Sequence, residues 1–368
     1  MKKYIIMGIC TMLVVLTSIV WYLKFQKASD EDKDMKPCNA IYYWKTQFQL
    51  NNYEKSFIEK HDIRKIYIRF FDVDYGQDKD GLFKALPIAT TLFHDTVPAE
   101  IEVVPTVYIT TKAINADSTF AQLMYKRIIA MAKRNKIRNI HEIQVDCDWT
   151  NSTKDSFFKL CKDLRNILHK DSLSLSATIR LHQLEKECPP VDYGVLMLYN
   201  TGSLYNSNAN SILDYNDVKP YLSSKQEYAL PLDVAFPIYS WGIWMRQNDF
   251  KSILHKTDFT DTLYYKQMDK WKYVVSKEHY LEGHHLKKGD IIRLETSPLE
   301  DIIKVKQLAF SKIRRHPRNI ILYHLDSLNI AQYSEENIRL IYIVVHETFL
   351  LHFIIDIAMS IFIGLWPL

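Results

Sequence analysis

Glycine is scarce in this chain, and so are runs of one charge sign. Only 9 of the 368 residues are Gly and 12 are Pro, which excludes a collagen-like or low-complexity chain. No Gly-rich phosphate loop follows the first predicted strand, so a nucleotide-binding fold has no support. The 47 Lys and Arg mix with the 43 Asp and Glu and form no nucleic-acid footprint. We therefore expect no nucleic-acid partner, no metal site and no cofactor.

Cysteine is also rare, and its spacing excludes two common sites. No pair has the C-x-x-C spacing of a zinc ribbon or a thioredoxin motif. Cys147 falls in a predicted strand and Cys161 in the helix after it, which favours buried thiols. A disulfide from one of them to Cys188 or Cys38 is the alternative. The fifth cysteine is Cys10, which lies in an apolar leader.

An uncharged apolar run at residues 4–23 follows Lys2 and Lys3. Its length matches the roughly 20 residues that a helix needs to cross a bilayer. It ends in Trp21 and Tyr22, which suit a membrane interface better than a cleavage site. We therefore predict an uncleaved signal-anchor over residues 1–27 with lipid as its partner, and a solvated linker over residues 28–38. The following domain is then expected on the periplasmic or extracellular side.

The C-terminal residues 341–368 are strongly apolar and predict a hydrophobic helix or tail. A second membrane segment over residues 349–366 is an alternative. Asp356 lies near the middle of that segment, and an ionised group there costs roughly 3 kcal/mol, which argues against insertion.

Short apolar runs alternate with amphipathic stretches between the two ends. Nearly continuous apolar runs are typical of strands buried on both faces of a parallel sheet. The pattern predicts a (β/α)₈ TIM barrel over residues 39–340, with a doubly wound open sheet as the alternative. Helices are expected at 118–135, at 152–169 with a Ser152–Asp155 capping box, and at 298–314. A small β insertion is expected at about 265–297, between the seventh and eighth strands. The eight strand candidates are 40–46, 65–73, 103–110, 142–149, 173–180, 193–200, 229–237 and 319–326.

Active sites of such barrels lie at the carboxyl ends of the strands. Asp146 and Asp148 alternate along the fourth strand candidate, so both side chains should share one face. Two close carboxylates raise one pKa, which suits a general acid, and we predict both as catalytic. Support of loops through hydrogen bonds is the alternative role for an inward Asp. The predicted substrate-binding residues, which stand at or after other strand ends, are Tyr43, Trp44, Asp72, Tyr199, Asn200, Trp241, His324 and Asp326.

Two of these strands carry a family resemblance. Residues 143–148, Ile-Gln-Val-Asp-Cys-Asp, resemble the fourth-strand D-x-x-D-x-D-x-E motif of the chitinase-like family 18 glycoside hydrolases. Residues 197–200, Met-Leu-Tyr-Asn, are similar to the sixth-strand M-x-Y-D of that family, and 175–178 fit the strand between. Residues 41–328 as a whole resemble, more closely, an uncharacterised bacterial family of glycosidase-like TIM barrels.

The resemblance implies a barrel that acts on or binds a glycan, but two positions depart from it. Thr150 stands where the family has its general acid, a Glu, and Asn200 stands where it has an Asp. Another carboxylate could replace the acid, with Asp148, Asp74 and Asp326 as candidates. The hypothesis is therefore a membrane-anchored, glycoside-hydrolase-like barrel. The alternative is a non-catalytic carbohydrate-binding or structural barrel that has lost its acid.

Overall fold

The computed structural model describes residues 37–115, 119–205, 210–223, 228–313 and 317–343. The predicted signal-anchor at 1–27 and the apolar tail from 344 onward lie outside these ranges. Among the helices within them, none has the length and apolar character needed to cross a bilayer.

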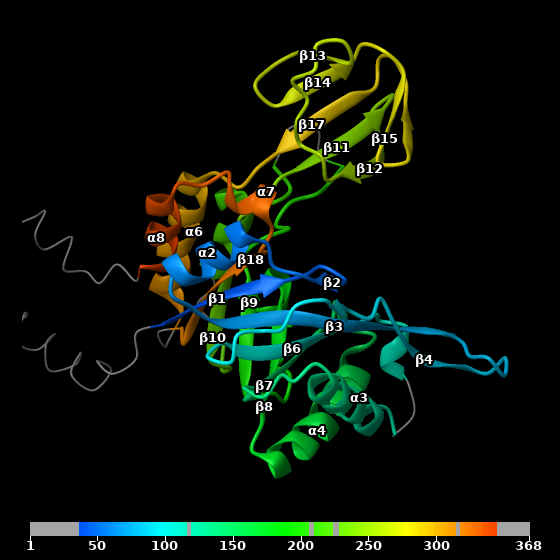
Figure 1. Cartoon of the computed structure of the whole chain (residues 1–368), viewed down its shortest axis with the longest axis vertical. Helices are drawn as coiled ribbons and strands as arrows, with labels where there is room; N and C mark the ends of the chain where they lie inside the picture. Colours follow the sequence, from blue (N-terminus) through cyan, green and yellow to red (C-terminus); the bar gives the residue numbers. More distant parts are fainter. Residues whose placement is uncertain (1–36, 116–118, 206–209, 224–227, 314–316, 344–368) are drawn as a thin grey trace, which may run out of the picture. The chain divides into compact units, whose positions relative to one another are not determined.

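Eight parallel strands form a closed barrel (Figure 1). β1 pairs with β3 on one side and with β18 on the other, which joins the two ends of the sheet. All eight predicted strands are present, so the barrel is confirmed. In barrel order the strands are β1 (Cys38–Tyr43), β3 (Ile63–Gln77), β6 (Glu102–Ile109), β7 (Glu142–Asp146), β8 (Ser174–Ile179), β9 (Tyr193–Met197), β10 (Leu232–Pro237) and β18 (Asn319–Tyr323).

The helices around the barrel are less regular than the predicted repeat. Residues 78–101 between β3 and β6 contain no helix. Instead β4 (Phe83–Ile88) pairs antiparallel with the extended end of β3, and β5 (Leu92–Phe93) pairs with β2 (Gln47–Phe48). Only the 3-10 turn Leu181–Gln183 separates β8 from β9. The α-helices are α2 (Asn52–Lys60), α3 (Phe120–Arg134), α4 (Lys154–Leu168), α5 (Tyr215–Leu222), α6 (Leu299–Lys312), α7 (Ser327–Ile330) and α8 (Glu335–Tyr342).

In α4 the apolar periodicity predicted the buried face of the helix correctly, whereas the predicted capping residue was wrong. Phe157, Leu160 and Leu164 of the predicted stripe are buried toward the barrel. The predicted Ser152–Asp155 capping box is wrong, because the helix begins one residue later, after Thr153, with no side-chain cap. The Ser152 hydroxyl instead lies 2.9 Å from that of Thr150.

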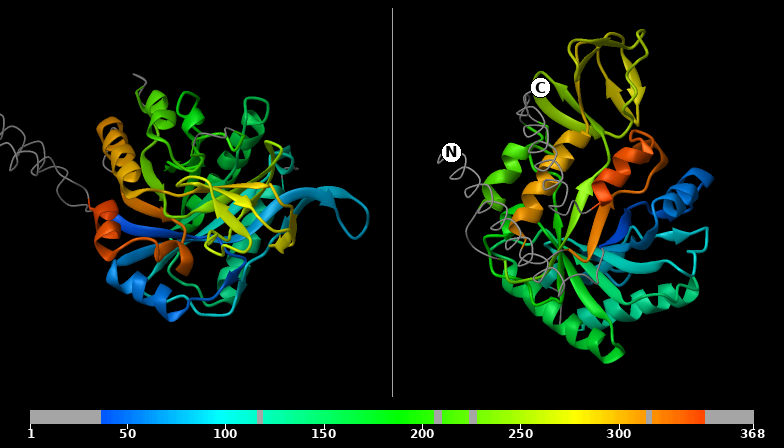
Figure 2. Two further views of the ribbon diagram at one scale, coloured as in Figure 1. Left: turned by 90° about the horizontal axis from the view of Figure 1, so that it is seen from above. Right: turned by 90° about the vertical axis from the view of Figure 1, so that its left-hand side faces the viewer.

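A second sheet lies in sequence between β10 and β18, as expected, and is drawn in green to yellow in Figures 1 and 2. Its strands begin at Trp241, so the sheet includes two strands before the expected range of 265–297. Trp244, Leu254, Phe259 and Ile292 belong to an apolar core of its own. The strands, in sheet order, are β12 (Asp249–Leu254), β11 (Trp241–Arg246), β17 (Ile291–Glu295), β14 (Lys272–Val275) and β13 (Tyr265–Gln267), and a hairpin of β15 (His279–Leu281) and β16 (His284–Leu286) accompanies them.

The cysteines of the described ranges are all free thiols. Cys147 and Cys161 are buried, as predicted, and Cys38 and Cys188 are half-buried. Burial raises the pKa of the Cys147 and Cys161 thiols well above their usual value, so both stay protonated at neutral pH.

Candidate functional site

A cavity of about 250 Å³ opens among side chains from the carboxyl ends of the barrel strands. Every barrel strand except β10, or the residues directly after it, contributes to the wall. We refer to this cavity as the mouth pocket. Its lining residues are Tyr42, Trp44, Arg69, Asp72, Tyr108, Asp146, Thr178, Arg180, Met197, Tyr199, Asn200 and Tyr323.

One wall of the mouth pocket is an ion pair within β3. Arg69 Nε donates to Asp72 Oδ1 at 2.7 Å, and Arg69 Nη2 donates to the other oxygen. Residues three apart on a regular strand point to opposite faces. A bulge between Arg69 and Phe71 shifts the register and brings both side chains to the pocket. The Arg69 guanidinium also lies over the Trp44 ring, 5.7 Å from its centroid.

Another part of the wall contains Asp146, whose residue is 3% exposed. Its Oδ1 accepts from the Thr178 hydroxyl at 2.6 Å and from Arg180 Nη2 at 3.4 Å. Burial raises the pKa of Asp146, while Arg180 and Thr178 lower it and Asp148 raises it further. The predicted direction of the shift is therefore present, but burial is its main cause rather than the second carboxylate.

Asp148 is placed differently from its expected position. β7 ends at Asp146, so the two aspartates do not alternate along one strand, and the expectation from strand geometry is wrong. The Asp148 side chain is half-exposed beyond the strand, and its Oδ1 accepts from Arg180 Nε at 2.6 Å. Arg180 therefore brings the two carboxylates together by binding both.

Tyrosines form much of the remaining wall. The rings of Tyr199 and Tyr323 stack with centroids 4.7 Å apart. The Tyr199 hydroxyl is buried and has no hydrogen-bond partner among the described residues. Burial, followed by the charges of Asp148 and Asp146, raises the pKa of Tyr108 to about 12, so its hydroxyl remains a donor at neutral pH.

The structure brings five of the ten predicted site residues into the mouth pocket. These are Trp44, Asp72, Asp146, Tyr199 and Asn200. Asp148 lies at the rim through its bond to Arg180. Asn200 is exposed, and its Oδ1 accepts from the Tyr239 hydroxyl at 2.6 Å.

The other four predicted residues do not line the pocket. Tyr43 is buried against Phe48 and donates to the Gln47 carbonyl. Trp241 Nε1 donates to Glu295 of the inserted sheet at 2.7 Å.

Asp326 and His324 have roles in the chain around the end of β18. Asp326 caps α7 and pairs with Lys45 at 2.7 Å, and this lysine holds the pKa of Asp326 low despite burial. Burial lowers the pKa of His324 to about 4, so this ring is neutral at physiological pH.

Seven lining residues were not among the predicted site. Thr178, Arg180 and Tyr323 stand at or directly after strand ends, so position alone could have found them, whereas Arg69 lies in the middle of β3. Tyr42 lies two positions before the predicted Trp44, which directly follows β1, and a period of two would have indicated a shared face. Tyr108 lies one residue before the end of β6. The seventh is Met197, whose sulfur contacts Arg180 Nη1.

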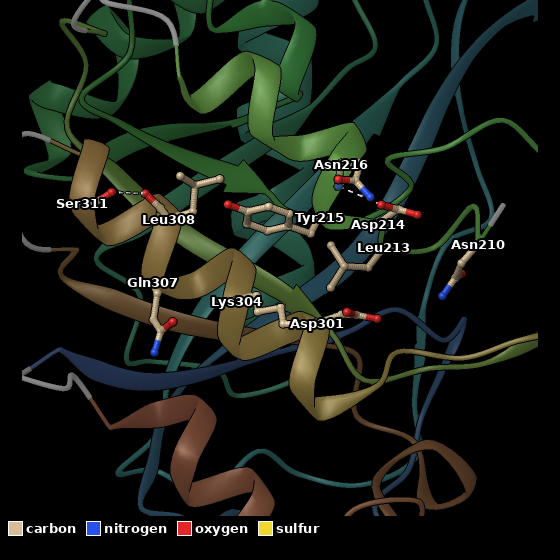
Figure 3. A pocket seen from close by; sticks show the side chains of 10 residues that line it. All are labelled: Asn210, Leu213, Asp214, Tyr215, Asn216, Asp301, Lys304, Gln307, Leu308 and Ser311. Carbon is tan, nitrogen blue, oxygen red and sulfur yellow. Dashed lines mark hydrogen bonds between the residues drawn. The ribbon is translucent and has the colours of Figure 1, made fainter.

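Two further features of the described residues lie outside the mouth pocket or concern metal ligands. No group of three or more His, Cys, Asp or Glu within these ranges is arranged to hold a metal ion. A second hollow of about 800 Å³ lies between α6 and the loop that leads into α5 (Figure 3). Asp214, Tyr215, Asp301 and Lys304 are among its lining residues, and none of the ten predicted site residues is.

The comparisons with known proteins give similar folds only. No family model matches the chain, and no curated protein matches it either. A chitinase of Chromobacterium violaceum is 14% identical with a TM-score of 0.49, covering 80% of this chain and 97% of its own. The spore cortex-lytic enzyme SleL of Bacillus cereus is 15% identical with a TM-score of 0.48, covering 83% and 74%.

A Group IV chitinase of Ostrinia furnacalis is 14% identical with a TM-score of 0.49, covering 83% of this chain and 98% of its own. Chitinases and a spore cortex-lytic enzyme are thus among the solved structures that are similar to this chain, at low sequence identity. None of these similarities assigns an activity to this chain.

Proposed function

We propose that the mouth pocket binds one sugar unit of a glycan without hydrolysing it. The observation that carries the proposal is that each acidic side chain of the pocket is ion-paired with an arginine. Arg69 holds Asp72, and Arg180 holds both Asp146 and the rim residue Asp148.

The chemistry of the lining supports a sugar as the ligand. Aromatic faces pack on the C–H surface of a sugar ring, and the half-buried Trp44 and Tyr323 of the lining supply aromatic side chains for this contact. Sugar hydroxyls both donate and accept hydrogen bonds, and paired arginines and carboxylates offer both functions in fixed geometry. The volume of about 250 Å³ lies below the roughly 300–1,000 Å³ of drug-sized sites, which favours a single ring. An open pocket also disfavours a purely structural barrel.

The same pairing disfavours hydrolysis. A glycosidase needs one carboxylic acid that protonates the leaving oxygen and a second carboxylate that acts as base or nucleophile. Asp72 is bound by two nitrogens of Arg69, and Asp148 is bound by Arg180. Thr150, at the position of the family's acid, bonds to Ser152 and Thr153 in an exposed loop.

One observation favours hydrolysis as a second candidate function. Burial raises the pKa of Asp146, and a raised pKa is what a general acid needs near neutral pH. In that case Asp146 would donate the proton, and Asp148, released from Arg180, would act as the second carboxylate.

We also propose that residues 4–23 hold the barrel at a membrane, on its periplasmic or extracellular side. The support is the length of this apolar run and its aromatic end. Flotation of the full chain with lipid vesicles, and its loss when the run is replaced by a polar sequence, tests this proposal. A full chain that stays soluble and does not float would contradict it.

A panel of soluble oligosaccharides, including chitooligosaccharides and peptidoglycan fragments, tests the pocket. The full chain should bind at least one member in a calorimetric titration, and the same sample should release no new reducing ends. Trp271→Ala is the matched control, because Trp271 is an exposed tryptophan of the inserted sheet region that does not line the pocket. Binding that Trp271→Ala abolishes and Trp44→Ala leaves intact would contradict the proposed site.

A further inference from the structure

Four cations stand close together where α3 ends and the chain turns toward β7. Lys133 and Arg134 occupy the last turn of α3, and Lys136 and Arg138 follow in the loop. All four are exposed. None of them has an ion-pair partner among the residues that the structure describes. We call these four residues the basic cluster.

Two acidic groups at this end of the barrel already have cationic partners. Asp62 pairs with Arg64 and Glu335 pairs with Lys60. Asp171, in the loop before β8, accepts from the Tyr125 hydroxyl. Lys170, next to Asp171, is a further exposed cation. The exposed Glu59, in the last turn of α2, and the exposed Glu100, before β6, are further acidic side chains at this end, and the four cations of the basic cluster with Lys170 outnumber them.

Strand direction places the basic cluster at the end of the barrel away from the mouth pocket. The cluster directly precedes β7. Because all eight barrel strands are parallel, the cluster lies at the end of the barrel where the strands begin. The mouth pocket is formed at the carboxyl ends of the same strands. A surface that contacts the basic cluster therefore leaves the pocket open.

Both ends of the described domain lie at the amino-terminal end of the barrel as well. The Tyr342 hydroxyl, at the end of α8, donates to the Ala40 carbonyl of β1 at 2.9 Å. The buried Lys306 ammonium donates to the Ile341 carbonyl at 2.7 Å and to the carbonyls of Leu340 and Ile343. The chain toward the apolar run 4–23 and the chain toward the apolar residues after 343 thus leave the barrel at the same end as the basic cluster.

We propose that the basic cluster docks the amino-terminal end of the barrel on a surface of anionic phospholipid, with the mouth pocket facing away. Anionic headgroups attract basic side chains that lie within a Debye length of the surface, about 8 Å at physiological ionic strength. A tether at the same end keeps the cluster at high effective concentration near the bilayer. The proposal goes beyond glycan binding and rests on the membrane anchor, which flotation tests separately.

Amide hydrogen exchange of the full chain in lipid vesicles tests the docking. Exchange at residues 133–141 should be several-fold slower in vesicles that contain phosphatidylglycerol than in pure phosphatidylcholine. High salt should remove the difference, because the attraction is screened. The variant Lys133→Gln/Arg134→Gln/Lys136→Gln/Arg138→Gln should lose the difference at low salt, while it still floats with the vesicles and binds glycan as before.

The matched control is Lys251→Gln/Lys256→Gln/Lys266→Gln/Lys270→Gln, which removes four exposed lysines from the inserted sheet region. This variant should keep the protection at 133–141. Equal exchange in both kinds of vesicle would overturn the proposal. So would equal protection by a soluble polyanion such as polyphosphate, since the cluster would then be a general anion site rather than a lipid contact. Thermal unfolding of both variants checks that they fold.

Discussion

Arg180 Nε donates to Asp148 Oδ1 at 2.6 Å, and this bond joins two residues that lie just past the ends of neighbouring strands. A second nitrogen of the same guanidinium contacts the buried Asp146. One cation therefore compensates the buried carboxylate of Asp146 and fixes the Asp148 carboxylate at the rim of the mouth pocket. Because the Arg180 guanidinium pairs with both carboxylates, we expect the free energy of unfolding and the ligand affinity to depend on its charge.

Loss of this cation should destabilise the fold. Removing one partner of a buried pair leaves an uncompensated charge and costs about 3–5 kcal/mol. We expect Arg180→Met to lower the free energy of unfolding by about 3 kcal/mol at neutral pH, within that range. The loss should be smaller in acid, where Asp146 takes up a proton. Urea unfolding at the two pH values measures both.

Asp146→Asn in the Arg180→Met background should recover part of the stability, because it removes the charge that Arg180 compensated. Lys159→Met is a matched surface control, since the Lys159–Asp163 pair is exposed and such pairs contribute little. An Arg180→Met protein as stable as the unmodified chain at neutral pH would be incompatible with the proposed role of this pair.

Glycan affinity should depend on Trp44. Its half-buried ring lines the mouth pocket, where it contacts the Arg69 guanidinium and the rings of Tyr42 and Tyr323. An aromatic residue central to a binding site contributes about 2 kcal/mol or more, so Trp44→Ala should weaken binding roughly thirtyfold. Calorimetric titration measures the change, and an unchanged dissociation constant would place the ligand elsewhere.

His324 should make the fold sensitive to mild acid. Burial lowers its pKa to about 4, whereas an unfolded chain has the ordinary value of 6.5. The unfolded state therefore binds more protons between these values, so stability falls as pH drops from about 6.5 to about 4. The full loss is about 3 kcal/mol from linkage. His324→Gln should flatten this part of the stability–pH curve, and a curve of unchanged slope would show that another group is responsible.

Lys306 should produce a shift of the same sign at alkaline pH. Burial lowers its pKa to about 8 from an ordinary 10.5, so the folded state releases its proton first. Stability should therefore rise by up to about 3 kcal/mol between pH 8 and pH 10.5. The difference in unfolding free energy between the natural chain and Lys306→Met isolates this contribution. A difference that stays constant over the range would contradict the assignment.

The barrel could be predicted from the sequence because its strands are buried on both faces. Runs such as Ile66, Tyr67 and Ile68 are fully buried, and this leaves the nearly continuous apolar pattern that indicates a parallel sheet. The first residue of the inserted sheet could not be predicted from the sequence. Its first strand, Trp241–Arg246, follows β10 closely and carries the same apolar character, so no change of composition marks the start.

The carboxylates of the candidate site could be predicted from their positions along the strands, but their ion-pair partners could not. Strand ends pointed to Asp146 and Asp72, whereas their partners depend on register and local irregularity. Arg180 reaches Asp146 from the next strand, 34 residues along the chain. Arg69 reaches Asp72 because of a β-bulge, which the alternation of residues along the strand does not predict. Ion pairing across strands thus decides the chemistry, and it is a tertiary property.

The most direct test of the account is one titration of the full chain with its best-bound oligosaccharide, followed by measurement of reducing ends in the same sample. We expect saturable binding, no new reducing ends, and an Asp146→Asn variant that shows no turnover either. Release of reducing ends by the natural chain, abolished by Asp146→Asn, would contradict non-catalytic binding and identify Asp146 as the acid of a hydrolase.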